Sequence, residues 1–322
     1  MDKTTVFESI DRLLQVEVRL PFLVRGTIPK LYQCARGMGQ PITKQIAEAI
    51  MAAIERGKNR IMLVTGFYEP GIFPCGESDG LYGAAALGKG LSKIGASVSI
   101  GVEPECAEAM QKLAECIDLS CQVIGLDRGV AQRAVNAKLA DCCDIAIFIE
   151  KCGPSAYGVY HFATATPRDR AYDADMNGFL EAMEQTGKLT IGIGDYGNEI
   201  GFGNIYREAL DIVGRGCKCP YNEGIVTVSR TNYLLPCCVS NIGAYGVLSA
   251  LALLTGNLDI LHTESDEHKL VELGNKIGVV DGSYGYCHDS VDGVPLAALC
   301  GYISILQAIP HQYYEDILDR GF

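Results

Sequence analysis

The strongest constraint on the fold is an alternation of two kinds of segment along the chain. Short apolar runs rich in β-branched residues recur between longer stretches whose apolar residues follow a helical period. The expected strands are 60–66, 97–102, 121–126, 144–150, 189–194 and 224–229. The expected helices between them are 42–57, 104–117, 129–140 and 173–187. This order predicts an α/β fold in which a mostly parallel sheet carries helices on both faces, as three αβα-like layers.

The chain of 322 residues contains no internal repeat and no low-complexity linker. Because domains usually comprise roughly 100–200 residues, we expect one large domain or two closely packed α/β lobes over residues 42–322. Residues 1–41 carry no motif that indicates a function. We interpret them as an N-terminal helical arm or lid.

The balance of charged residues is acidic, with 27 Lys and Arg against 39 Asp and Glu and a formal net charge of −12. Such a charge repels nucleic acids and anionic membranes and favours cations as partners. The first residues, MDKTTVFESIDRLL, lack a secretory signal. The longest apolar stretch, 242–256, is about five residues shorter than the roughly 20 that span a membrane. We therefore expect a cytoplasmic protein without nucleic-acid or membrane partners, and leave open whether it forms a homo-oligomer.

The chain has 14 cysteines, but none of them forms a Cys-x-x-Cys motif. The nearest approaches to a thiolate cluster are Cys217 with Cys219 and two pairs of adjacent cysteines. None of these pairs has the spacing of a structural zinc site. Cytosolic chains of this length rarely need disulfides. We expect the cysteines to be small buried apolar residues or incidental thiols.

Acidic residues gather in glycine-rich loops, most of which follow expected strands. In parallel α/β sheets, ligands bind at the carboxyl ends of the strands, so these loops are the candidate site. Ser78 or Asp79 is expected to cap a helix after the first strand. The acids concerned are Glu77, Asp79, Glu150, Asp195, Glu199, Asp281 and Asp292.

The loop IGIGDYGNEIGFG, residues 191–203, contains the glycine spacing of a dinucleotide-binding turn at Gly192, Gly194 and Gly197. Asp195 lies inside this spacing and Glu199 follows it, where we expect a helix to begin. Both carboxylates would repel a pyrophosphate, so the pattern disfavours a dinucleotide site. Helix capping is the simplest alternative for the acids, but it explains only one or two of them.

An oxygen-rich set of ligands without paired thiolates or imidazoles is typical of a site for a hard divalent cation, Mn²⁺ or Mg²⁺. Such an ion would bridge the acids to a small anionic substrate that carries carboxylate or phosphate. The N–H groups of the glycines in 78–83 are expected to contact that anion. No nucleophile for acyl-enzyme chemistry is evident, because the chain contains no G-x-S-x-G motif.

Five segments, in order along the chain, resemble the C-terminal domain family of the D-glutamate cyclases and its free-standing prokaryotic relatives. The resemblance covers roughly residues 42–295. The matching segments are TGF at 65–67, ESDGLYGAAAL at 77–87, IGIGDYGNEIGFG at 191–203, SNIGAYG at 240–246 and VVDGSYGYCHDSVDG at 279–293.

The resemblance implies an α/β fold, a divalent metal in an acidic pocket, and interconversion of D-glutamate with 5-oxo-D-proline plus water. By motif match, it implies metal or substrate roles for Glu77, Asp79, Asp195, Asn198, Glu199, Asp281 and Asp292, and for Glu150 and Asn241. As individual roles we expect metal ligation by Glu77, Asp79, Asp195, Glu199 and Asp281. We expect substrate binding by Asn198, Asn241 and Glu150, and by Ser78 and Gly80 in the glycine-containing segment 78–83. We expect catalytic roles for Asp195, Glu199, Asp281 and Asp292. A manganese-dependent phosphatase and a non-catalytic metal or amino-acid binding protein remain alternatives, because both use acids, glycines and a hard cation.

The chain departs from the pattern of that family in the segment 149–160 and at three other positions. Lys151, Pro154 and Tyr157 stand where the family has an arginine, a second basic residue and an acid. Tyr196, Phe202 and Ile242 replace glycine, methionine and tryptophan. Loss of an arginine removes a bidentate partner for a substrate carboxylate, which weakens the assignment of the substrate.

Overall fold

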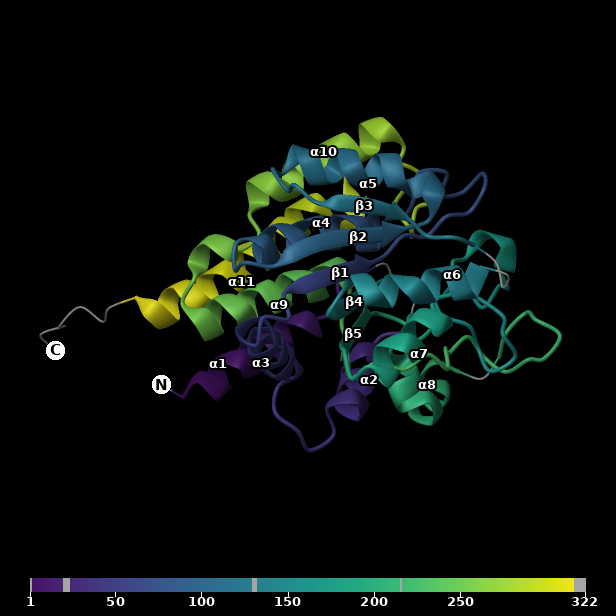
Figure 1. The fold of residues 1–322 in the computed structure, drawn as a ribbon, viewed down its shortest axis with the longest axis horizontal. Coiled ribbons are helices and arrows are strands. Elements are labelled where there is room, and N and C mark those ends of the chain that lie inside the picture. The colour runs from purple at the N-terminus through teal and green to yellow at the C-terminus, as the bar shows by residue number, and fades with distance from the viewer. Residues whose placement is uncertain (1, 20–23, 129–131, 215, 316–322) are drawn as a thin grey trace, which may run out of the picture.

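The computed structural model describes residues 2–19, 24–128, 132–214 and 216–315. Its centre is a six-stranded sheet in the order β3-β2-β1-β4-β5-β6, and every neighbouring pair of these strands is parallel. Figure 1 shows the stack with β3 at its upper edge. The strands are β1 (Arg60–Val64), β2 (Ser97–Val102), β3 (Gln122–Gly125), β4 (Ile145–Ile149), β5 (Leu189–Gly194) and β6 (Tyr233–Pro236). The predicted parallel α/β fold is confirmed.

Helices connect the strands and cover both faces of the sheet. They are α1 (Lys3–Leu14), α2 (Thr27–Arg36), α3 (Ile42–Glu55), α4 (Ser78–Ser92), α5 (Ala107–Cys116), α6 (Arg133–Ala137), α7 (Asn177–Gln185), α8 (Tyr206–Val213), α9 (Ser240–Thr255), α10 (Glu264–Ile277) and α11 (Leu296–Tyr314). Within the described ranges, no helix is both long enough and apolar enough to cross a membrane.

The apolar side chains of the central strands point alternately to the two faces of the sheet, which explains why helices cover both faces. In β1, Ile61 and Leu63 pack into the core formed with α4 and α9, whereas Met62 and Val64 pack into the core formed with α7 on the opposite face. Successive side chains of a strand point to opposite faces, so a strand that is apolar throughout requires two covering layers. The sheet is therefore the middle of three layers.

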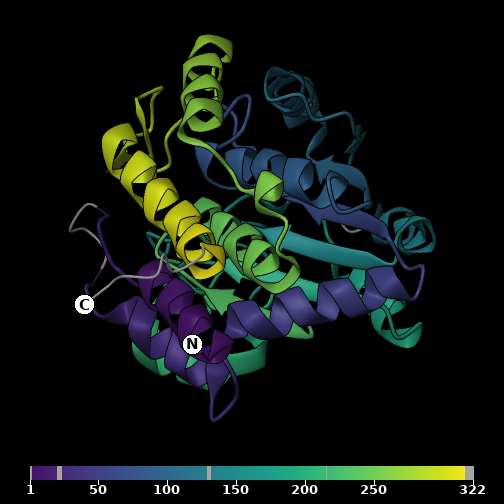
Figure 2. The same ribbon diagram turned by 90° about the vertical axis from the view of Figure 1, so that its left-hand side faces the viewer.

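The N-terminal helix α1 packs against α3, α9 and α11. Figure 2 shows the purple N-terminal helices beside the yellow α11. Asp11 of α1 is fully buried and accepts hydrogen bonds from the Ile42 N–H, at 2.6 Å, and from the hydroxyls of Thr43 and Tyr32. Helix α3 begins after Pro41 and has no side-chain cap of its own. Asp11 thus caps a helix about 30 residues further along the chain.

We expect Asp11→Ala to lower the free energy of unfolding by about 2–3 kcal/mol, because the buried donors of Ile42 and Thr43 lose their acceptor. Urea denaturation followed by circular dichroism measures the change. Asp2→Ala is the control, since Asp2 caps α1 at an exposed position and its loss costs about 1 kcal/mol or less. Equal effects of the two substitutions would contradict a special role for Asp11.

Three expected elements differ from the structure. Residues 224–229 form no strand; Thr227 and Val228 instead donate irregular hydrogen bonds to the loops that follow β5 and β4, and the last strand of the sheet is β6. The helix expected over 129–140 is shorter, with α6 followed by a 3₁₀ turn, and 129–131 lie outside the described residues. Cys217 and Cys219 form a disulfide, although we expected unpaired thiols.

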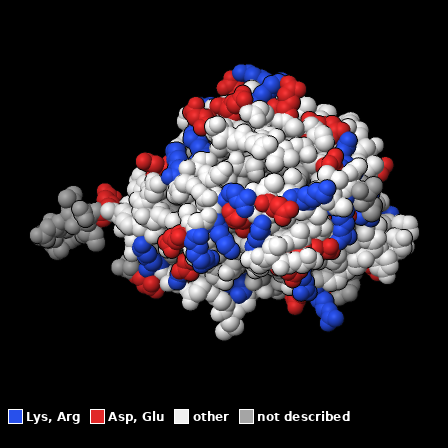
Figure 3. Space-filling model, in the orientation of Figure 1, with Lys and Arg blue, Asp and Glu red and all other residues white. Residues whose placement is uncertain are grey.

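The excess of acids is not concentrated on the face drawn in Figure 3, where Lys and Arg alternate with Asp and Glu. Several acids are instead buried at one edge of the sheet, among them Asp79, Glu150 and Asp195. Buried carboxylates are costly unless they are paired, protonated or bound to a cation. Part of the excess of acidic residues in the sequence is therefore buried at this edge of the sheet.

Candidate functional site

Three carboxylates meet at the carboxyl edge of the sheet. Asp79 comes from the connection after β1, Glu150 follows β4, and Asp195 follows β5. One carboxylate oxygen of each residue lies within 4.8 Å of those of the other two, and all three side chains are buried. Strands β1 and β4 are neighbours although β2 and β3 follow β1 in sequence, so the cluster lies where the strand order reverses. Doubly wound sheets bind their ligands at this switch point.

The backbone around this three-carboxylate cluster adopts conformations that few residues favour. Glu150 has φ of 51° and Asp292 has φ of 49°, in the left-handed region. Gly80 has φ of 89°, and a Cβ there would clash with Thr65 Oγ1. Residues held in such backbone conformations are frequent at functional sites, where interactions with the surrounding structure offset a strain of about 1–3 kcal/mol.

Asp79 and Asn241 join the starts of α4 and α9. Asp79 accepts hydrogen bonds from the N–H groups of Ser240 (2.9 Å) and Asn241 (2.8 Å). In return, Asn241 Oδ1 accepts from the N–H groups of Gly80 (2.8 Å) and Gly83 (2.7 Å). Each residue therefore supplies the cap that the other helix lacks. The expectation that Asp79 caps its own helix is corrected: it caps α9.

These hydrogen bonds also change the roles expected for Gly80 and Asn241. The Gly80 and Gly83 N–H groups donate to Asn241, and the Ser78 N–H donates to the Val280 carbonyl at 2.8 Å. These three N–H groups are thus engaged within the protein rather than free for a substrate anion. Of the substrate contacts expected here, the Ser78 hydroxyl retains capacity, because it is buried and has no hydrogen-bond partner among the described residues.

Glu199 belongs to the loop after β5. We expected a helix to begin at this residue, but none begins there. A short 3₁₀ turn separates it from α8, which begins at Tyr206. Glu199 Oε2 accepts hydrogen bonds from the N–H groups of Gly197 (2.8 Å) and Tyr196 (3.3 Å). Glu199 Oε1 is buried without a partner among the described residues. One half of the carboxylate is fixed and the other half is available.

Arg19 is the functional residue that the sequence analysis missed. Its guanidinium forms ion pairs with Asp195 and, at 2.8 Å, with Asp292, and its side chain is 7% exposed. Arg19 belongs to the segment interpreted as an arm or lid, which therefore contributes to the acidic site. The available signal was a single arginine between apolar residues in VEVRLPF.

The acidic loop 279–293 differs from the other candidate loops in the element that it follows. Residues 279–293 follow α10 rather than a strand of the main sheet, and a parallel bridge between Glu77 and Val280 fixes them beside the β1 loop. Asp281 uses both carboxylate oxygens within its own loop, including 2.5 Å from the Ser290 hydroxyl and 3.0 Å from the Gly293 N–H. These bonds give Asp281 a loop-forming role, while Asp292 pairs with Arg19 and Ser283.

The acids of this site cannot all be charged at neutral pH. Burial, reinforced by neighbouring carboxylates, raises the pKa of Glu77 and Glu150 well above the usual range for Glu. Burial also raises the pKa of Asp195 well above its usual range, although Arg19 opposes the shift. Burial and Asp292 raise the pKa of Asp79 to about 7. One arginine does not compensate this cluster, so protons or a further cation must do so.

The available donor atoms fit a hard divalent cation. Three carboxylates converge, and unpartnered oxygens are buried in the same loops, on Glu199, Asn198 and Ser78. Carboxylate, amide and hydroxyl oxygens are the ligands that Mg²⁺ and Mn²⁺ prefer. The geometry favours Asp79, Glu150 and Asp195 as the metal ligands. Glu77, Glu199 and Asp281, which were also expected to bind the metal, are not members of this three-carboxylate cluster.

Lys151, which replaces the expected arginine, does not contact the three-carboxylate cluster. It is buried and forms an ion pair with Glu103 behind the loops. Tyr157, which replaces an acid, is 54% exposed. Neither of these two positions thus provides a cation to the cluster, and among the described residues Arg19 is the cation that forms ion pairs with Asp195 and Asp292.

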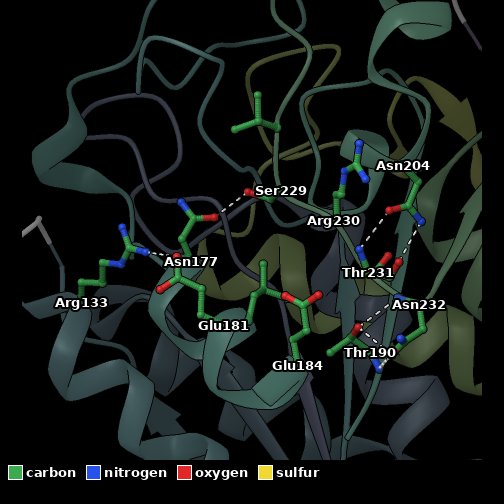
Figure 4. A pocket seen from close by; sticks show the side chains of 12 residues that line it. Arg133, Asn177, Glu181, Glu184, Thr190, Asn204, Ser229, Arg230, Thr231 and Asn232 are labelled. Atoms are coloured by element: carbon green, nitrogen blue, oxygen red, sulfur yellow. Dashed lines mark hydrogen bonds and ion pairs between the residues drawn. The ribbon is translucent and has the colours of Figure 1, made fainter. Parts of the chain in front are cut away.

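A separate pocket of about 560 Å³ lies beside α7, between that helix and the segment 228–232. Figure 4 shows its lining, in which Thr190 pairs with Asn232 and Arg133 pairs with Glu181. The part of a strand that lines the pocket, Thr190, lies at the amino end of β5, whereas α/β sheets bind ligands at the carboxyl ends of their strands. Topology therefore favours the acidic cluster as the functional site.

Comparison with known proteins gives two findings. The sequence model of a family described as D-glutamate cyclase-like, C-terminal, matches residues 33–307. The human protein named D-glutamate cyclase, mitochondrial, is 26% identical over 239 residues, which are 68% of this chain and 36% of that protein. The chain thus spans about a third of the length of this relative. Arg19 lies outside the segment matched by the family.

Proposed function

Because the chain belongs to the D-glutamate cyclase-like C-terminal family, we propose that it is a hydro-lyase that interconverts D-glutamate and 5-oxo-D-proline plus water. The convergence of Asp79, Glu150 and Asp195 carries the proposal, since it joins buried carboxylates from three adjacent strands at the switch point of the sheet. The activity named for the human relative supports the choice of substrate.

Asp79, Glu150 and Asp195 are assigned as ligands of a divalent cation, Mn²⁺ or Mg²⁺. When bound, such an ion supplies a Lewis acid for the γ-carboxyl group of glutamate or for the lactam carbonyl. The hydrogen bonds from Ser240 and Asn241 orient Asp79, and the Ser240 hydroxyl, 2.5 Å from Glu150, orients that residue. Each carboxylate oxygen has more than one lone pair, so these bonds leave it able to bind a cation.

Ring closure moves two protons from the ammonium group of D-glutamate to the departing carboxyl oxygen. The nitrogen loses one proton before it attacks the γ-carbon and a second one afterwards, and the oxygen gains two protons and leaves as water. Glu199 is assigned as the base, because its Oε1 has no partner within the described chain. Glu77 is assigned as the acid, because burial raises its pKa and so favours its protonated form. Ring opening uses the same two groups with their protonation states exchanged.

The test is chirally resolved product analysis with metal-stripped protein, with and without restored Mn²⁺. We expect 5-oxo-D-proline and D-glutamate to interconvert only when Mn²⁺ is present. L-Glutamate and 5-oxo-L-proline serve as stereochemical controls and are expected to react far more slowly.

Absence of product in both directions from folded, Mn²⁺-loaded protein would contradict the proposed reaction. A phosphoester screen under the same conditions then tests the phosphatase alternative. Saturable binding of D-glutamate without product would instead indicate a binding protein.

A further inference from the structure

A second group of potential metal ligands is formed by residues outside the three-carboxylate cluster. One ligand atom from each of His161, Cys217 and Cys219 lies within 4.8 Å of those of the other two. The three residues come from two segments far apart in sequence, and neither segment supplies one of the three clustered carboxylates. Their chemistry is also different, since two sulfurs and an imidazole replace the oxygens of the acidic site.

His161 provides an independent sign that a ligand is missing here. The side chain is 1% exposed, and both ring nitrogens are buried without a hydrogen-bond partner among the described residues. Buried imidazoles normally satisfy at least one nitrogen, because an unpaired buried polar group costs about 1–3 kcal/mol.

The backbone holds the two segments in register. Residues 161–167 form a tight turn closed by a bridge between His161 and Pro167. The Lys218 N–H donates to the Ala165 carbonyl at 2.8 Å, and Lys218 Nζ donates to the Thr166 hydroxyl at 3.1 Å. Because Lys218 is fixed to this turn, the cysteines on either side of it are held near His161.

We propose that, in the reduced protein, Cys217, Cys219 and His161 form a binding site for Zn²⁺ or a similar thiophilic cation. Two thiolates and one imidazole are typical zinc ligands, and a set of three leaves the fourth tetrahedral position for water or another ligand. From the sequence, Cys217 and Cys219 were set aside as a zinc site because of their spacing, and the third ligand comes from a residue more than 50 positions away.

The disulfide between Cys217 and Cys219 makes this site dependent on redox state. An external thiol reductant supplies two electrons and two protons to open the bond, giving two thiols. Binding of Zn²⁺ then releases those two protons, since thiolates are the ligands. Oxidation of the pair by an external disulfide reverses both steps and expels the metal. Cys217 is half-buried, so small reagents are able to reach the pair.

The site has a direct contact with the loop that carries Asp195 and Glu199. Asn198 Nδ2 donates to the His161 carbonyl at 3.1 Å and contacts Cys152 Sγ at 3.3 Å. A metal ion on His161 therefore braces the segment on which Asn198 rests. This contact does not require that the acidic site catalyse the proposed reaction, so the two proposals are tested separately.

The experiment is titration of metal-stripped, reduced protein with Co²⁺ in the presence of excess Mg²⁺. Co²⁺ bound to thiolates gives an intense charge-transfer band in the near ultraviolet, which carboxylate ligands do not produce. We expect this band to saturate at about one equivalent and to disappear when Zn²⁺ displaces Co²⁺. Protein oxidised to the Cys217–Cys219 disulfide is expected to give no band, and reduction restores it.

Variants locate the site. Cys217→Ser and Cys219→Ser are each expected to weaken Co²⁺ binding at least about tenfold and to reduce the band, because one thiolate is lost. Cys142→Ser, at an exposed free cysteine, is the matched control and is expected to bind as the native protein does. His161→Gln is included if circular dichroism shows that it folds.

Three outcomes would overturn the proposal: no thiolate band in the reduced native protein, an equal band in the oxidised protein, or a band unchanged in both cysteine variants. The comparison of oxidised with reduced native protein needs no substitution and remains informative if a variant fails to fold. Turnover of D-glutamate by the acidic site is not part of the readout.

Discussion

Asp195→Asn is expected to reduce the Mn²⁺-dependent interconversion of D-glutamate and 5-oxo-D-proline by on the order of 10²–10³-fold. Asp195 is a member of the three-carboxylate cluster and also holds Arg19. An amide has a similar shape but no negative charge, so the substitution removes charge from the cation site while preserving its volume. Initial rates and Mn²⁺ affinity, measured by calorimetry, should both fall.

Asp259→Asn is the matched control, because Asp259 is an exposed acid in the short 3₁₀ helix after α9 and is not a member of the three-carboxylate cluster. We expect the control to retain native rates and native Mn²⁺ affinity. If Asp195→Asn retains both turnover and Mn²⁺ binding while remaining folded, the assignment of Asp195 is wrong. Loss of turnover with unchanged Mn²⁺ affinity would leave Asp195 a role in catalysis and remove it from the ligand set.

Arg19→Ala is expected to lower the free energy of unfolding of the metal-free protein by about 3 kcal/mol at pH 8, because it leaves buried carboxylates without their cation. Asp195 and Asp292 both lose their partner. Burial raises the pKa of Asp195 and raises that of Asp79 to about 7. These acids gain protons as the pH falls, so the loss should be smaller at pH 6 than at pH 8.

Urea denaturation at both pH values, with and without Mn²⁺, measures this effect. Mn²⁺ should stabilise Arg19→Ala more than it stabilises the native protein, since the ion meets more uncompensated negative charge in the variant. Arg36→Ala is the control, because its pair with Glu8 is 22% and 25% exposed and is worth about 1 kcal/mol or less. Equal stability of Arg19→Ala and the native protein at pH 8 would show that Arg19 does not balance the cluster.

The sequence predicted most of the sheet, because its strands are buried on both faces. Such strands appear as continuous apolar runs, and the expected segments 60–66, 97–102, 144–150 and 189–194 overlap β1, β2, β4 and β5 closely. The irregular segment 224–229 misled the prediction since it too is buried, with Ile225 at 2% exposure. Burial of an apolar run does not by itself establish pairing with a neighbouring strand.

The sequence also indicated where the candidate site lies, because parallel connections return every strand in the same direction and bring the loops after them to one edge. Asp79, Glu150 and Asp195 were all among the expected acids. Which acids converge could not be predicted, since that depends on the strand order β1-β4-β5, in which β1 and β4 are separated by two strands along the chain.

By itself, then, the sequence determined the parallel α/β class and the acidic loops of the site, because both follow from local apolar patterning and short-range composition. Only the tertiary structure decided the partners of those loops. Asp11 caps α3, Asp79 caps α9, and Arg19 balances Asp195. Each of these contacts joins residues far apart in sequence, and its energy exists only once packing has removed water from both partners.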